Sequence, residues 1–138
     1  YEEAFAHLRR SIEIDDALPY DEPWGWMQPT RHAYGALLLE QGLVEEAAAV
    51  YAADLGFNSS LPRGQQHPGN VWALHGYHEC LQLLGRSEEA ALVGHQLKIA
   101  VAMADVPIKA SCFCRLSAVE TAEAQPSQQC CTSETGHA

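Results

Sequence analysis

Basic side chains are scarce in this 138-residue sequence, which has 8 Lys and Arg against 18 Asp and Glu. The net charge of -10 argues against nucleic acid and anionic membranes as main partners, because both repel a negative surface. No apolar run approaches the roughly 20 residues of a membrane-spanning helix, and no signal-peptide pattern opens the chain. These absences predict an acidic cytoplasmic protein, long enough for one domain or a short repeat array.

Motifs of common catalytic sites are also missing. The sequence has no Gly-rich phosphate loop, no nucleophile elbow and no His-Glu-x-x-His pattern. Paired acids occur, as in Glu45-Glu46 and Glu88-Glu89, but such pairs at helix starts are expected to be solvated and to favour the helix dipole. The sequence therefore leaves catalytic residues unassigned.

A self-similarity with a 43-residue offset is the most informative pattern that is present. The string Glu-Glu-Ala recurs at 2–4, 45–47 and 88–90. The same offset carries His32 onto His75 and Gly42 onto Gly85. A fixed period between about 20 and 50 residues indicates stacked supersecondary units.

Each unit is predicted to contain two helices, because its apolar residues recur at helical spacing. We expect helices over 30–41 and 44–55 in the first unit, and over 70–84 and 87–104 in the second. Thr30 and Asn70 are expected N-caps, and Gly42 and Gly85 are expected to end the first helix of each pair.

These residues resemble the tetratricopeptide repeat (TPR) family over about residues 1–105. Gly35 lies in the first helix, Gly42 at the turn, Ala47 early in the second helix and Tyr51 about one turn later, as in the consensus. The resemblance implies an all-α fold, a right-handed α-solenoid of TPR-like helix pairs. The period is 43 rather than about 34 residues, which places the extra residues in long inter-repeat loops.

The repeat interpretation divides the chain into five parts. Residues 1–16 form the second helix of a truncated repeat, 17–56 a repeat with a long Trp-rich loop, and 57–105 a second repeat. Residues 106–117 form a capping segment with Cys-x-Cys, and 118–138 a disordered tail with little apolar content. The missing first helix predicts a fragment of a longer array or, alternatively, self-association through the open repeat ends.

The resemblance also implies a concave groove lined by the first helix of each pair, and therefore a scaffold that binds a peptide or protein segment. The expected ligand-groove residues are His32, Glu40, Trp72, His75 and Glu79, with Trp24 and Trp26 of the first loop beside them. An acidic, aromatic groove favours basic or apolar ligands. For the two loop tryptophans, the alternative is that they cover the apolar end of a helix pair.

The histidines and cysteines support an alternative function, a copper- or zinc-binding metalloprotein, in its strongest form an enzyme. The candidate ligands are His32, His75, His78, Cys112 and Cys114, since imidazole and thiolate suit these metals. The other interpretation is that the histidines bond core groups and that the cysteines are small buried apolar residues. His78 in particular is expected to be a core residue accommodated by Gly94, and the thiols are expected to be reduced.

Overall fold

The computed structural model describes residues 1–22 and 28–115. These residues form five α-helices and two short 3-10 helices and contain no β-strand, so the predicted all-α class is confirmed. The elements are, in chain order, α1 (Glu2–Asp16), α2 (Thr30–Glu40), α3 (Val44–Leu55), η1 (Arg63–Gln65), α4 (Val71–Leu83), α5 (Ser87–Met103) and η2 (Phe113–Arg115). None of the helices in these two ranges combines the length and the apolarity that a bilayer span requires.

Local signals explain where the helices end. Gly42 and Gly85 follow α2 and α4 with φ angles of 73° and 70°, a left-handed conformation that suits a residue without Cβ. Asn70 caps α4 as predicted, because its side chain accepts hydrogen bonds from the backbone N–H groups of Trp72 and Ala73. The five predicted helices therefore agree with the structure to within one residue at each end.

The start of α2 differs from the expectation. Pro29 holds the N-cap position and Thr30 is already the first helical residue. The Thr30 hydroxyl instead donates a hydrogen bond of 3.0 Å to Asp15 at the end of α1. Beside it, the Arg31 guanidinium donates to both carboxylate oxygens of Asp16 at 2.6 Å. The polar residues at this helix start therefore join α2 to α1 rather than cap α2.

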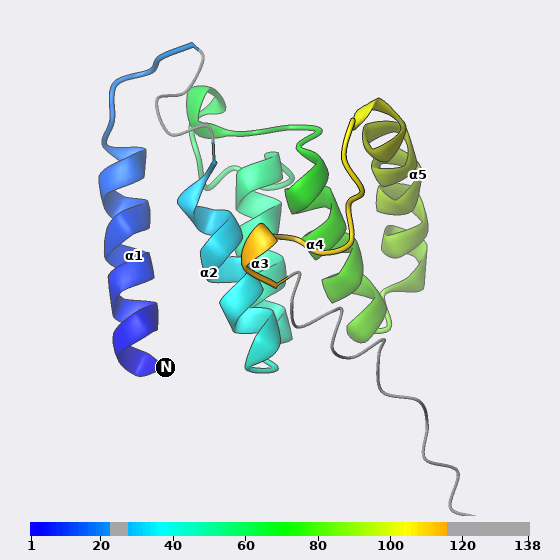
Figure 1. Cartoon of the computed structure of the whole chain (residues 1–138), viewed down its shortest axis with the longest axis horizontal. Coiled ribbons are helices and arrows are strands. Elements are labelled where there is room, and N and C mark those ends of the chain that lie inside the picture. Colours follow the sequence, from blue (N-terminus) through cyan, green and yellow to red (C-terminus); the bar gives the residue numbers. More distant parts are fainter. Residues whose placement is uncertain (23–27, 116–138) are drawn as a thin grey trace, which may run out of the picture.

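The helices lie side by side in chain order, each packed against the next (Figure 1). In addition α2 contacts α4 directly, so α2, α3 and α4 contact one another pairwise. The alanines of α3 permit this close approach, since Ala47 and Ala48 are almost fully buried. Leu38, Leu74 and Leu81 complete the core, and each buried leucine contributes roughly 1.5–3 kcal/mol relative to exposure.

After α5 the chain turns back and crosses α4 toward α2, as the yellow and orange trace in Figure 1 shows. The short helix η2 contacts α2, and Ala110, Ser111 and Cys112 are buried. The expected fold-back over the last helix pair therefore extends further, to the first helix of the preceding pair. The predicted tail at 118–138 and the loop residues Trp24 and Trp26 lie outside the described residues.

Candidate functional site

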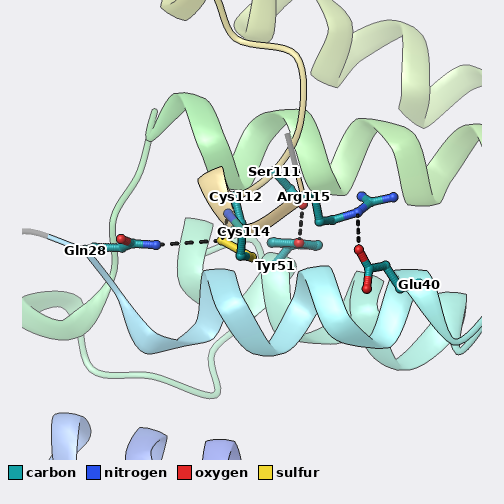
Figure 2. The surroundings of a disulfide bond; sticks show 7 residues. All are labelled: Gln28, Glu40, Tyr51, Ser111, Cys112, Cys114 and Arg115. Atoms are coloured by element: carbon teal, nitrogen blue, oxygen red, sulfur yellow. Dashed lines mark hydrogen bonds and ion pairs between the residues drawn. A yellow bond between two sulfur atoms is a disulfide. The ribbon is translucent and has the colours of Figure 1, made fainter. Parts of the chain in front are cut away.

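Residues 110–115, which we call the docked segment, lie against α2 and α4 (Figures 1 and 2). We call the surface that they cover the α2–α4 face. The segment reads Ala-Ser-Cys-Phe-Cys-Arg, and its first three residues are buried. Contacts of Arg115, Phe113 and Ser111 hold it in place, and each contact reaches a different part of the face.

Arg115 is held by carboxylates from two helices. Its guanidinium donates to Glu79 of α4 through Nη1 at 3.1 Å and Nη2 at 3.3 Å, and its Nε lies 3.9 Å from Glu40 of α2 (Figure 2). The Arg115 side chain is 14% exposed, whereas those of Glu79 and Glu40 are 31% and 35% exposed. Bidentate pairs of this kind are stronger than neutral hydrogen bonds, especially where water is partly excluded. Glu79 therefore binds the guanidinium through two hydrogen bonds, while Glu40 adds a longer ion pair to an Nε that has no hydrogen-bond partner among the described residues.

Trp72 supplies an aromatic contact on the same face. Its ring lies 4.5 Å from that of Phe113, centroid to centroid, at an interplanar angle of 47°. Such tilted aromatic pairs stabilise by about 0.5–1.5 kcal/mol beyond the area they bury. Phe113 remains 59% exposed, so the Trp72 ring covers it on one side only.

The side chain of Tyr51 on α3 passes between α2 and α4 and contacts the docked segment. A Cβ atom on Gly35 of α2 or on Gly76 of α4 would come closer than 3.0 Å to atoms of the Tyr51 ring. The Tyr51 hydroxyl donates a buried hydrogen bond of 2.7 Å to Ser111 (Figure 2). Burial raises the pKa of Tyr51, and the hydrogen bond to Ser111 offsets this only in part. Tyr51 is therefore a neutral phenol that ties three elements together.

Cys112 and Cys114 form a disulfide, which contradicts the expectation of reduced thiols. Cys112 is buried, at 3% exposure, whereas Cys114 is exposed. The Cys112 sulfur accepts hydrogen bonds from Gln28 Nε2 at 3.8 Å and from the backbone N–H of Cys114 at 3.2 Å. Cys80 is a buried free thiol whose pKa is raised to about 12, mainly by burial.

His32 belongs to a buried hydrogen-bonded group that the sequence did not suggest. Its Nε2 lies 3.0 Å from one carboxylate oxygen of Asp54, and His67 Nδ1 lies 2.7 Å from the other. Burial raises the pKa of Asp54, but the hydrogen bonds and charges of the two histidines outweigh it and the net shift is downward. Asp54 is fully buried, so this carboxylate fixes the 57–69 connection to α2 and α3.

His75 and His78 lie elsewhere on α4. His75 is half-buried, its Nδ1 is enclosed without a hydrogen-bond partner, and burial lowers its pKa. His78 lies against Gly94, where an added Cβ would come within 3.2 Å of its Nε2. The predicted contact between His78 and Gly94 is therefore present, but His78 is half-buried rather than a core residue.

The candidate metal ligands do not converge in the part of the chain that the structure describes. Within it, no three His, Cys, Asp or Glu side chains form a group that could hold a metal ion. His32 is committed to Asp54, and the sulfurs of Cys112 and Cys114 are bonded to each other rather than present as thiolates.

Two cavities accompany these contacts. One of about 140 Å³ lies beside the docked segment and is lined by Gln28, Pro29, His32, Asn70, Trp72, Cys112 and Phe113. A larger one of about 270 Å³ shares Gln28 and Pro29 with the first and lies between the 17–22 and 61–67 stretches. Arg31 lines the larger cavity but is already paired with Asp16, so we assign no ligand there.

Of the residues predicted for a ligand groove, Glu40, Trp72 and Glu79 contact the docked segment, and His32 lines the cavity beside it. Sequence reasoning missed Arg115, Ser111, Asp54 and Gly76. Asp54 carried one usable signal, because it is an acidic residue on a helix face otherwise occupied by Tyr51 and Leu55. Comparison with protein-family models, with curated proteins and with solved structures finds no match to this chain.

Proposed function

We propose that this chain is a TPR-like scaffold module whose α2–α4 face binds a peptide segment of another protein. The observation that carries the proposal is the docked segment, because a short stretch of polypeptide occupies this face through side chains from two helices. Recognition of a peptide in a helical groove relies on the same elements: a pocket for an apolar anchor and a charged partner for a polar one.

The helix pairing supports the repeat part of the proposal. Helices α2 and α3 pack together, as do α4 and α5, and each pair is joined by a short turn that contains a left-handed glycine. Tyr51 packs against Gly35, two of the residues on which the family resemblance depends. These contacts are those expected of two consecutive helix pairs in a solenoid.

The chemistry of the face indicates the class of ligand. Glu79 accepts both hydrogen bonds of the guanidinium, Glu40 adds a second negative charge 3.9 Å from it, and Trp72 offers an aromatic surface on the same face. In the docked segment the residues that use these groups are Phe113 and Arg115, two positions apart. We therefore propose ligands with an aromatic residue followed two positions later by arginine, which also suits the acidic charge of the chain.

The copper or zinc alternative gains less support from the geometry. It needs reduced cysteines and a histidine cluster, whereas the cysteines are joined and His32 is bonded to Asp54. His75 has an enclosed ring nitrogen without a partner, but a single imidazole does not make a metal site. We therefore retain peptide binding as the proposal.

A peptide-binding measurement tests the proposal directly. The probe is a fluorescent peptide of residues 108–115 with serine at both cysteine positions, and the protein is the full chain carrying Phe113→Ala and Arg115→Ala, which weakens its own docked segment. We expect this variant to bind the probe, and Glu40→Gln with Glu79→Gln to weaken binding by about tenfold or more, the effect of losing charged hydrogen bonds.

The matched control is Glu45→Gln with Glu88→Gln, which removes the same charge from the first turns of α3 and α5. This pair should leave the affinity for the probe nearly unchanged. Equal losses in the two pairs would mean that only net charge matters, and no binding by the parent variant would rule out the proposed ligand class.

A further inference from the structure

The two sulfurs of the disulfide have different surroundings. Cys114 is exposed, while Cys112 is buried and lines the cavity of about 140 Å³. In thiol–disulfide exchange an incoming thiolate must reach one sulfur, and the other sulfur leaves with the electron pair of the broken bond. Access alone therefore selects Cys114 as the sulfur that is attacked.

The surroundings of Cys112 suit a leaving thiolate. Its sulfur already accepts hydrogen bonds from the Gln28 side-chain amide and from the backbone N–H of Cys114. A negative sulfur accepts such bonds more strongly than a neutral one, so these donors favour the thiolate. The adjoining cavity leaves space for the Cys112 side chain to separate from Cys114 without displacement of α2 or α4.

We propose that Cys112–Cys114 is a thiol–disulfide exchange site that accepts electrons from a dithiol. A thiolate of the dithiol attacks Cys114 Sγ, the bond between the two cysteines breaks, and Cys112 leaves as a thiolate that takes up a proton. The second thiol of the dithiol then displaces Cys114, which is protonated in turn. The dithiol becomes a disulfide, both cysteines become thiols, and the two protons lost by the dithiol are those gained by the chain.

This site is separate from the charged part of the α2–α4 face. Arg115 and its two glutamates take no part in the exchange, and the sulfurs take no part in the ion pairs. Both proposals involve the docked segment, but the test of peptide binding and the test of exchange measure different groups, so either one can fail without the other.

The first experiment compares the two cysteines one at a time, each in a chain that also keeps the buried Cys80. The full chain carries Cys130→Ser and Cys131→Ser, two positions outside the described residues, and then either Cys112→Ser or Cys114→Ser. Glutathione disulfide is the probe, and mixed-disulfide formation is followed by intact mass. We expect Cys114, in the Cys112→Ser protein, to react at least about tenfold faster than Cys112 in the other variant. Equal rates or the reverse order would overturn the proposal.

The second experiment does not depend on those variants folding. In the chain with Cys130→Ser and Cys131→Ser, dithiothreitol should reduce Cys112–Cys114 while far-UV circular dichroism stays unchanged, and glutathione disulfide should restore the bond. Gln28→Ala should slow the reduction by roughly two- to tenfold, the range for one lost hydrogen bond. Gln96→Ala on α5 serves as its control. A bond that is reduced only in denaturant would be structural, and thiols that never form the bond would equally overturn the proposal.

Discussion

At the scale of single residues, His75 of α4 has a pKa that depends both on burial and on the charges around it. Its ring is half-buried, and burial is the main reason why its pKa is lowered from the ordinary value of 6.5. The nearby Glu79 raises the pKa, whereas His78 and Arg115 lower it. His75 is therefore best accommodated as a neutral imidazole.

The lowered pKa of His75 should be visible in how the free energy of unfolding changes with pH. The unfolded chain takes up a proton at His75 first as the pH falls, so its contribution to stability is complete above about pH 6.5 and is lost as the pH drops toward the folded-state pKa. We expect His75→Leu to flatten the curve of unfolding free energy against pH in the window that extends downward from 6.5. Urea unfolding at a series of pH values measures this dependence. If the slope of unfolding free energy against pH were the same in the variant, the lowered pKa of His75 would be contradicted.

At the scale of helices, the sequence was sufficient to predict where the helices begin and end. Helical spacing, the Asn70 cap and the glycines after α2 and α4 are local signals, and the predicted helix bounds agree with the structure. The position of the docked segment was harder to predict from the sequence, because its contacts join residues that are 36 to 84 positions apart, from Arg115–Glu79 to Gln28–Cys112. No repeat register links Glu40 with Glu79 or points to Arg115, so the pairing required the three-dimensional arrangement.

The close approach of α3 to α4 depends on Gly76, and a matched pair of substitutions tests this. Gly76→Ala places a methyl group against the Tyr51 ring and the Cβ of Ser111, so we expect a loss of about 1–3 kcal/mol in unfolding free energy. Gly94→Ala gives a similar gain in helix propensity, up to about 1 kcal/mol, and contacts only the far end of the His78 side chain. Gly94→Ala should therefore leave the unfolding free energy unchanged or increase it.

Chemical denaturation of both variants provides the measurement. The difference between them isolates packing against Tyr51 and Ser111, because the propensity gain is common to both. If Gly76→Ala were as stable as Gly94→Ala, the Tyr51 ring would not be confined between α2 and α4.

At the scale of the whole molecule, the stretch from Ala104 to Lys109 acts as a tether. It joins the end of α5 to the buried start of the docked segment. A short flexible tether holds a ligand at an effective concentration on the order of millimolar. A free peptide that binds the same residues must compete with this internal ligand, so its apparent affinity is lower than its intrinsic affinity.

Lengthening the tether should relieve the competition. An insertion of about 12 Gly and Ser residues after Asp105 would treble its length, and effective concentration falls roughly as the −3/2 power of length. We expect the fluorescent peptide described above to bind the lengthened chain up to about fivefold more tightly than the parent chain. The same insertion in the Phe113→Ala, Arg115→Ala background should have no such effect, because the internal ligand is already weakened there.

For the peptide ligands proposed above, the tether sets a threshold of affinity that a ligand must exceed to bind the α2–α4 face. A ligand that makes the same contacts as the docked segment, present at micromolar concentration, is outnumbered by an internal competitor at roughly a thousandfold higher local concentration. Only a ligand with additional contacts, or one presented at high local density by an assembly of its own, displaces it. The length of six residues after α5 thus sets how selective the face is, without changing any residue that touches the ligand.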